Sequence, residues 1–361
     1  MDANDIENNL LKEVPVKLTE YSHGGGCGCK ISPLILEKIL DAELAFPDKK
    51  LLVGNSSKDD AAVYDLGDGN ALISTTDFFM PIVDDAFDFG RIASANAISD
   101  IYAMGAKPIL AIAILGWPVE KLSSSLAKKV IEGARSICAK AGITLAGGHS
   151  IDSAEPFFGL AVNGLVSIPY LKKNNTAKEG DLLFLTKPIG VGILSTAQKR
   201  KVLKKEHLTI LVQQLTDLNN VGEALGKIKG VSAMTDVTGF GLAGHLIEMA
   251  EGSALSAHLH YSRLCLIEGV EEYISQGIAP GATSRNWNSY RKKIYFEKGI
   301  NVAKAFSILP DPQTNGGLLI AVNPHAVAEV QDVFKQFGLE KFITPVGVFI
   351  DKTEHVIIVK D

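Results

Sequence analysis

Cysteine is scarce in this chain, and its scarcity argues against a disulfide-stabilised secreted scaffold. The 361 residues contain four cysteines, Cys27, Cys29, Cys138 and Cys265, whose spacing matches no disulfide framework. Acidic residues stand near the N-terminus, and no apolar secretory segment follows them, so we expect a reducing, cytoplasmic location. Cys138 and Cys265 have apolar neighbours and are predicted to be core thiols.

Long apolar runs and a large excess of one charge are also missing. The longest apolar run covers residues 108–117, which is too short to cross a bilayer. The net charge of −5 comes with both signs spread along the chain, without a basic stripe. We therefore expect neither a membrane nor a nucleic acid as partner.

Length and patterning predict two domains. A chain of 361 residues exceeds the usual size of a single core. Strand and helix patterns are mixed, which indicates an α+β or α/β fold. The polar stretch 169–181 separates two apolar runs. We predict an arm with the first helix over residues 1–50, a first α/β domain over 51–170 and a second α/β domain over 171–361.

Local signals locate the main elements. A proline at the first helical position starts a helix at residue 33, and the turn sequence Gly-Asp-Gly-Asn predicts a β-hairpin over residues 61–76. Further helices are predicted at residues 91–104, 119–140, 208–227 and 242–250. Further strands are predicted at residues 143–146, 157–168, 182–186, 231–235 and 318–322.

Glycine is concentrated in residues 23–30 (HGGGCGCK), where four of eight residues are glycine. Glycine loses much backbone entropy on ordering, so a mobile loop is predicted. A thiol near a cation is a candidate for a lowered pKa, which makes Cys27 and Lys30 candidate functional residues. The loop fits neither a P-loop nor a dinucleotide fingerprint. A zinc site of His23, Cys27 and Cys29 stays open, although a second Cys/His pair at finger spacing is missing.

Five aspartates follow predicted strands and turns or lie on a small-residue helix face. Any one of them would fit a cap or a turn, but together they predict a Mg²⁺ site with phosphate oxygens as further ligands. Asp236 precedes a glycine-rich turn that opens a helix, whose N–H groups could hold phosphate. Residues 147–150 (GGHS) fit a nucleotide contact and a plain strand-end turn equally well. The aspartates are Asp59, Asp60, Asp77, Asp100 and Asp236.

Seven motifs in order resemble the selenophosphate synthetase (selenide, water dikinase) family, from about residue 19 to the last strand. The aspartate and Gly-Phe-Gly motifs are shared with the wider aminoimidazole ribonucleotide synthetase-like superfamily, whereas the Cys27–Lys30 loop is typical of the selenium enzymes. The motifs are residues 21–33 (YSHGGGCGCKISP), 59–64 (DDAAVY), 74–79 (STTDFF), 96–100 (NAISD), 146–150 (AGGHS), 234–241 (MTDVTGFG) and 311–318 (DPQTNGGL).

This resemblance implies a fold and a reaction. The fold is the two-domain superfamily fold, with a flexible glycine-rich N-terminal arm and a first domain that binds ATP and Mg²⁺. The reaction converts selenide, ATP and water into selenophosphate, AMP and orthophosphate. It also implies a homodimer, with K⁺ as a further candidate cation and a selenium-delivery protein as a candidate partner.

The resemblance also implies site residues. Cys27 and Lys30 match the essential cysteine and lysine, and Cys29 matches a second cysteine whose role stays open. Asn315 stands where the family more often has serine. The implied Mg²⁺ ligands are Asp60, Asp100 and Asp236. The implied nucleotide contacts are Lys30, Ser57, Lys58, Asp59, Asp77, Asp100, Gly148, His149 and Ser150.

Two alternatives remain beside this interpretation. Another ATP-dependent enzyme of the superfamily would use the same aspartates, but it gives no reason for the Cys27–Lys30 loop. A zinc- or thiol-binding protein would use His23, Cys27 and Cys29, but it gives no reason for the aspartates. Neither alternative explains the whole set of motifs.

Overall fold

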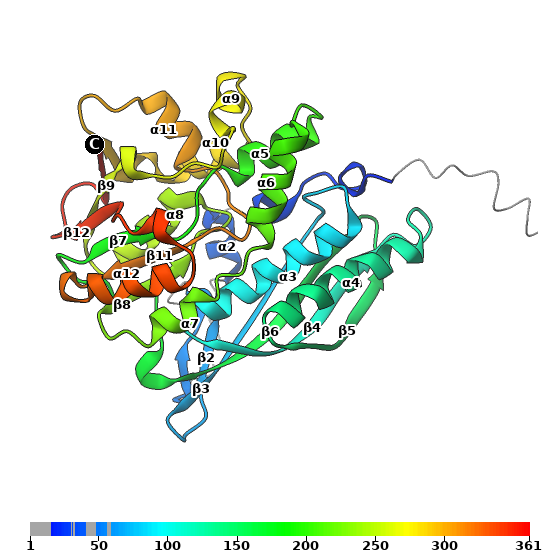
Figure 1. Cartoon of the computed structure of the whole chain (residues 1–361), viewed down its shortest axis with the longest axis horizontal. Coiled ribbons are helices and arrows are strands. Elements are labelled where there is room, and N and C mark those ends of the chain that lie inside the picture. Colours follow the sequence, from blue (N-terminus) through cyan, green and yellow to red (C-terminus); the bar gives the residue numbers. More distant parts are fainter. Residues whose placement is uncertain (1–15, 30, 32, 41–47, 56–58) are drawn as a thin grey trace, which may run out of the picture.

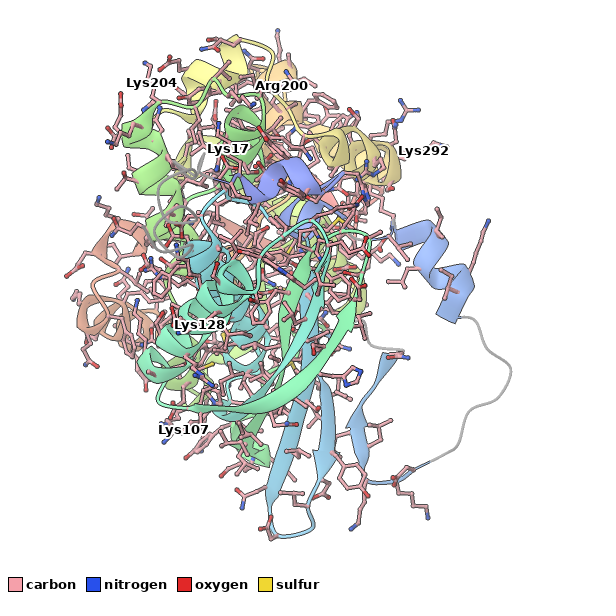
Figure 2. The ribbon with its side chains drawn as sticks, turned by 90° about the vertical axis from the view of Figure 1, so that its right-hand side faces the viewer. Lys17, Lys107, Lys128, Arg200, Lys204 and Lys292 are labelled. Atoms are coloured by element: carbon pink, nitrogen blue, oxygen red, sulfur yellow. The ribbon has the colours of Figure 1, made fainter. Side chains whose placement is uncertain are left out.

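The computed structural model describes residues 16–29, 31, 33–40, 48–55 and 59–361. These residues form two sheets flanked by helices, the first sheet within residues 51–167 and the second within residues 182–360 (Figure 1). In the described parts, we find no helix with the length and apolar character needed to span a membrane. Lysines and arginines are distributed over the surface, as those labelled in Figure 2 illustrate.

The first sheet has six strands in the order β1-β2-β3-β6-β4-β5. All neighbours pair antiparallel except β4 and β5, which pair parallel. The predicted hairpin is confirmed, with Val63 opposite Ile73. The strands are β1 (Leu51–Val53), β2 (Ala62–Asp65), β3 (Asn70–Phe79), β4 (Lys107–Trp117), β5 (Thr144–Asp152) and β6 (Phe157–Ser167).

Two helices cover one face of this sheet, α3 (Ala86–Ala103) and α4 (Ser124–Lys140) (Figure 1). Helix α3 begins before the predicted residue 91, because the carboxylate of Asp85 accepts a hydrogen bond from the Asp88 N–H (2.8 Å) and caps the helix. Nearly all of α3 is buried, so this helix is central to the core.

The other face of the sheet carries exposed apolar side chains. Phe78 on β3, Ile112 on β4 and Ile151 on β5 are 50%, 42% and 51% exposed. A folded domain rarely leaves such side chains together on one uncovered sheet face.

The second sheet has seven strands in the order β10-β13-β9-β12-β7-β11-β8. Its strands are β7 (Leu182–Leu185), β8 (Val231–Asp236), β9 (Ser256–His260), β10 (Ile294–Phe296), β11 (Leu318–Val322), β12 (Gly347–Ile350) and β13 (Ile357–Lys360). The helices of this half are α5 (Val191–Lys199), α6 (Lys205–Thr216), α7 (Val221–Gly226), α8 (Gly241–Gly252), α9 (Val270–Ser275), α10 (Gly281–Tyr290), α11 (Val302–Ile308) and α12 (Val327–Gln336).

Helix α3 joins the two halves of the molecule. It packs on β3 and β6 of its own half and on α6, α7 and β8 of the other half. One hydrophobic cluster accordingly includes Ile92 and Ile98 of α3 together with Ile193 of α5 and Leu211 of α6. Polar residues of α3 that face this junction are therefore held between the two sheets.

Several local predictions were wrong. The helix predicted over residues 208–227 is two helices, α6 and α7, and the buried Asn219 lies between them. Residues 147–150 lie inside β5 rather than in a turn after it, because they pair with β4 along its length. Cys138 is buried as predicted, whereas Cys265 is exposed.

Candidate active site

Acidic residues of both halves meet where α3 crosses between the sheets. Asp60 precedes β2, Asp100 is on α3 and Asp236 ends β8. The hydroxyl of Thr235 donates to Asp60 Oδ1 (2.9 Å), which connects the two halves directly. We call Asp59, Asp60, Asp100 and Asp236 the aspartate cluster.

Hydroxyl groups hold the other carboxylates of the cluster. Thr75 on β3 donates to Asp100 Oδ2 (2.6 Å), and Ser99 on α3 donates to Asp236 Oδ2 (2.5 Å). Asn219 in turn donates to the Ser99 hydroxyl (2.8 Å). These short bonds fix the carboxylates without neutralising them.

The electrostatics of the cluster favour a bound cation. Burial raises the pKa of Asp60 well above its usual range, and the nearby charges of Asp236, Asp100 and Asp59 raise it further. Burial also raises the pKa of Asp59, to about 6. Oδ2 of Asp59 and Oδ2 of Asp60 are buried and have no hydrogen-bond partner among the described residues. Since Mg²⁺ prefers carboxylate oxygens, the cluster fits this ion.

The described residues contain no preformed group of three or more His, Cys, Asp or Glu side chains at metal-binding distances. The carboxylates therefore form a region of like charge rather than a closed cage. Mg²⁺ usually binds one or two carboxylates together with substrate phosphates, and this arrangement suits that mode of binding.

The glycine loop rests against the same helix. Residues Gly26–Cys29 form a short 3₁₀-helix, η2, and Cys27 is 1% exposed. The Cys27 N–H donates to the hydroxyl of Thr314 (3.0 Å), and its thiol donates to Asn96 Oδ1 on α3 (3.2 Å). The loop predicted to be mobile thus has a defined docked position, with its thiol directed at α3.

Asn96 connects the loop to two other segments. Its amide donates to Asp77 Oδ2 (2.6 Å), and its carbonyl oxygen also accepts from the Asn315 N–H (2.7 Å). Asn96 is completely buried. One side chain therefore links Cys27, Asp77 on β3 and the 311–318 segment.

The glycines of the loop have a steric role as well as a conformational one. Gly26 has φ +56°, and a Cβ there would lie 2.6 Å from the Thr314 hydroxyl and from Ile82 Cδ1. A Cβ on Gly25 would lie 2.8 Å from the Pro81 carbonyl oxygen. Only glycine allows this backbone to lie so close to Thr314, the residue that binds the Cys27 N–H.

The 311–318 segment supplies contacts that were not predicted. Asn315 has φ +48°, a region that asparagine tolerates better than most residues, and its amide donates to the carbonyls of Leu215 and Asp217. Lys187 donates to the carbonyls of Asp217 and Asn315 (2.8 and 3.0 Å), and burial lowers its pKa to about 7. The sequence signal for Asn315 was the motif 311–318, but nothing local marks Lys187.

Some predicted site residues are elsewhere or not described. Lys30, Ser57 and Lys58 lie outside the described residues. In the first sheet Gly148 pairs with Ala113, Ala113 with Leu160, and Leu160 with Asp77. Gly148 and Asp77 are therefore three strand spacings apart, or about 14 Å. These two residues are thus well separated within one chain.

The glycine-rich turn after Asp236 differs from the prediction. The Ala243 N–H at the start of α8 donates to the Leu309 carbonyl, and a Cβ on Gly241 would collide with the Pro310–Asp311 backbone. The beginning of α8 is thus packed against protein rather than open to a phosphate. Two side chains of the zinc alternative also diverge, since the His23 ring pairs with Glu155 (2.8 Å) while Cys27 bonds to Asn96.

Family models and solved structures agree on the class of fold to which this chain belongs. The AIR synthase related protein family matches the chain in two parts, its N-terminal domain over residues 58–166 and its C-terminal domain over residues 178–360. Solved structures share this fold. The protein tt0281 from Thermus thermophilus has a TM-score of 0.69 at 18% identity, covering 91% of this chain and 96% of that chain. Hydrogenase maturation protein HypE in complex with ATP has a TM-score of 0.63 at 19% identity, covering 95% and 93%.

Relatives of higher identity give the particular family. "Selenide, water dikinase" of Yersinia pseudotuberculosis serotype I is 56% identical over 333 residues, which are 92% of this chain and 94% of the relative. The protein of that name from Escherichia coli O139:H28 is 54% identical over 341 residues, 94% of this chain and 96% of the relative. This chain belongs to the selenide, water dikinase family, and the family and fold expected from the motifs are confirmed.

Proposed function

We propose that this chain makes selenophosphate from selenide, ATP and water and releases AMP and orthophosphate. The observation that carries the proposal is the position of Cys27, whose thiol is directed at α3, the helix that also supplies Asp100 of the aspartate cluster. The names of relatives at 54–56% identity support it. A different ATP-dependent chemistry on this fold would leave the buried thiol without a purpose.

The aspartate cluster would hold Mg²⁺ and, through it, the polyphosphate of ATP. Asp60, Asp100 and Asp236 are the proposed ligands, because they come from three segments, the charges of Asp100 and Asp236 act on Asp60, and Asp60 Oδ2 has no hydrogen-bond partner among the described residues. Bound Mg²⁺ neutralises charge that develops on transferring phosphoryl groups. Further nucleotide contacts are proposed from Asp77, the segment Ser57–Asp59 and residues Gly148–Ser150, with Lys30 on the γ-phosphate.

The glycine loop would carry selenium to the phosphate. Selenide is a soft anion, and the soft sulfur of Cys27 would hold it as hydrogen selenide beside the phosphate, without a change of oxidation state. In the docked position the thiol is shielded from solvent and held by Asn96. Shielding the reacting group excludes competing water from a phosphate that must not be hydrolysed early. Lys30→Ala tests the other proposed loop contact, and full activity of that variant would remove it.

Phosphorus NMR with ATP, Mg²⁺ and selenide tests the reaction directly. We expect selenophosphate, AMP and orthophosphate in equal amounts, and only slow hydrolysis of ATP in the absence of selenide. ADP as the sole nucleotide product would contradict the proposal and favour an ordinary kinase of the same superfamily. Metal analysis of the purified protein covers the remaining alternative, for which stoichiometric zinc would be required.

We also propose that two copies associate through the uncovered face of the first sheet. Phe78, Ile112 and Ile151 support this proposal, because exposed apolar side chains on a sheet face are typical of interfaces. Ile112→Lys should shift the protein from dimer to monomer in light scattering after size-exclusion chromatography. Val302→Lys, on an exposed apolar residue of α11, is the control that should leave the dimer intact.

We propose that the enzyme works in a reducing compartment such as the cytoplasm, since its chemistry depends on a Cys27 that is not oxidised to a disulfide.

A further inference from the structure

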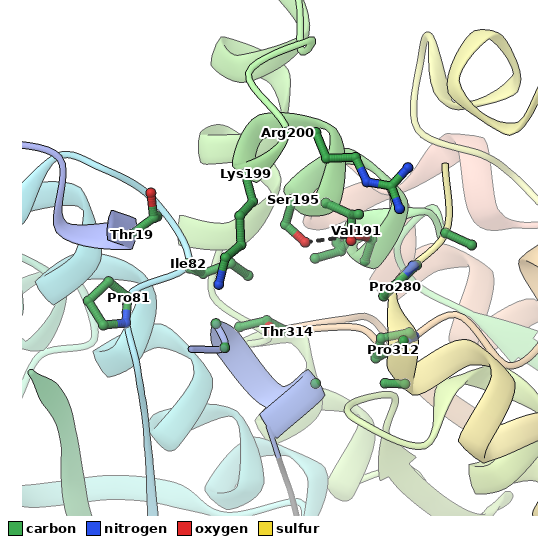
Figure 3. Close-up of a pocket in the computed structure, with 18 of the residues that line it drawn as sticks. Thr19, Pro81, Ile82, Val191, Ser195, Lys199, Arg200, Pro280, Pro312 and Thr314 are labelled. Carbon is green, nitrogen blue, oxygen red and sulfur yellow. Dashed lines mark hydrogen bonds between the residues drawn. The ribbon is translucent and has the colours of Figure 1, made fainter. Parts of the chain in front are cut away.

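A cavity of about 530 Å³ lies beside the glycine loop, on the side that faces the second half of the molecule (Figure 3). We call it the loop-side cavity. Gly24, Gly25 and Gly28 form part of its wall, whereas Cys27 itself does not line it. Its thiol is directed to Asn96 instead. The cavity and the thiol are thus separated by a single layer of loop backbone.

The described residues that line the cavity include several cations but no carboxylate. Lys199 and Arg200 come from the end of α5 and its cap (Figure 3). Arg285 comes from α10. His23 also lines the cavity, but its ring is paired with Glu155. A concave surface lined by one sign of charge concentrates ions of the opposite sign and speeds their arrival.

Two of these cations also hold the loop. Lys199 Nζ donates to the carbonyls of Ser22 and His23 (3.2 and 3.1 Å), and Arg285 donates to the Gly28 carbonyl (3.0 Å). These bonds fix the backbone on both sides of Cys27. Arg200 makes no such contact with the loop in the described structure, so a substitution there removes no hydrogen bond to the loop.

The opposite approach to Cys27 is unfavourable for a small anion. On that side the Asn96 that holds the thiol is bonded to the Asp77 carboxylate (2.6 Å), and Asp100 of the aspartate cluster is on the same helix, α3. An anion without its own metal would be repelled there, whereas Mg²⁺-bound ATP would not. Selenide in neutral water is mainly the monoanion HSe⁻. The two substrates therefore differ in the side from which electrostatics favours them.

We infer that the loop-side cavity is the access chamber for the small anionic substrate, hydrogen selenide, and that Arg200 attracts it. This inference rests on the proposed function and deepens it by giving the two substrates separate routes. The glycine loop is the partition between the chamber and the nucleotide, so selenide reaches Cys27 when the loop backbone moves aside.

Charge reversal at Arg200 tests the inference in steady-state kinetics under anaerobic conditions. Arg200→Glu should raise the KM for selenide roughly 10-fold and Arg200→Gln about 3-fold, with the KM for ATP unchanged. Arg135→Glu, an equal charge change on the exposed surface of α4, is the matched control and should match the wild type. A selenide KM for Arg200→Glu within twofold of the control would overturn the inference.

Alkylation of Cys27 gives a readout that does not depend on turnover. Iodoacetate and iodoacetamide are similar in size and differ in charge, and peptide mass spectrometry reports each cysteine separately. Arg200→Glu should lower the iodoacetate-to-iodoacetamide rate ratio at Cys27 about 10-fold and leave it unchanged at the exposed Cys265. An unchanged ratio at Cys27 would overturn the inference even if NMR shows selenophosphate, so it can fail while the proposed function stands.

The chamber could instead release an anionic product, and product inhibition separates the two directions. For an access chamber, inhibition by added orthophosphate should be the same in Arg200→Glu and Arg135→Glu. A weakened orthophosphate inhibition together with an unchanged selenide KM would assign the cavity to product release and overturn the inference.

Discussion

The aspartate cluster and the glycine loop both lie beside helix α3 but differ in how their polar groups are satisfied. Around Cys27, thiol, amide and carboxylate form an uninterrupted chain from Cys27 through Asn96 to Asp77. In the cluster, like charges crowd together, and buried oxygens of Asp59 and Asp60 lack partners among the described residues.

The difference shows which part of the site has its polar groups satisfied by the protein without a ligand. Unpaired buried carboxylates cost folding energy, and a cation removes that cost when it binds. The loop, in contrast, already has a hydrogen-bonded resting position. The cluster is therefore organised for ligands that arrive together, Mg²⁺ and ATP, while the loop is organised to hold and then present its thiol.

The largest expected effect comes from the thiol itself. Cys27→Ser keeps a donor to Asn96 but removes the soft nucleophile, so selenide-dependent AMP formation should fall by about 10³-fold or more. The melting temperature should stay close to that of the wild type. Cys265→Ser is the control at an exposed thiol and should keep full activity. Full turnover by Cys27→Ser would mean that the loop does not carry selenium through this residue.

Removal of one charge from the cluster should separate function from stability. Asp60→Asn should lower activity by roughly 10²-fold to 10³-fold through loss of a metal ligand. In the metal-free protein it should raise the melting temperature by about 2 °C, since one of several repelling charges is gone. Asp332→Asn, on the exposed face of α12, is the control in calorimetry and activity assays. A drop in metal-free stability would contradict the charge argument.

Replacement of Asn96 would disrupt the hydrogen bonds that hold the glycine loop. Asn96→Ala leaves Asp77, Cys27 and the Asn315 N–H without their shared partner, and we expect a loss of about 10-fold in kcat/KM. Alkylation of Cys27 by iodoacetamide should become faster, because the docked loop is weakened. Ser94→Ala removes another buried polar group of the same helix and should change neither rate. Equal alkylation in both variants would show that Asn96 does not hold the loop.

The smallest effect is the pH dependence of the cluster. The pKa of Asp59 is raised to about 6 from 3.8, so the folded metal-free protein binds this proton more readily than the unfolded chain. The stabilising contribution is therefore full below pH 3.8 and is lost as the pH rises through about 6. A Mg²⁺ ion held by the neighbouring Asp60 favours the charged form of Asp59, so Mg²⁺ affinity should fall by up to about tenfold per pH unit below pH 6. Calorimetric titration at pH 5.5 and 7.5 checks this, and equal affinities would contradict it.

Elements with local signals could be predicted from the amino-acid sequence. Proline at the first position gave the start of α2 (Pro33–Leu40), the Gly-Asp-Gly-Asn turn gave the β2–β3 hairpin, and a short apolar run gave β11. Residue types in the seven motifs were enough to identify the family. The same motifs identified Cys27 and the aspartates as candidate site residues, because a thiol in a glycine-rich loop and several aspartates can be recognised from residue types alone.

The connections between these residues depend on the packing of distant segments. Asn96 bonds to Cys27 and to Asn315 across sequence separations of 69 and 219 residues, which no local period reports. Pairing with β4 made residues 147–150 strand rather than turn. Burial lowered the pKa of Lys187 and raised those of Asp59 and Asp60. Desolvation and long-range contacts depend on which segments pack together, and that is decided when α3 is enclosed between the two sheets.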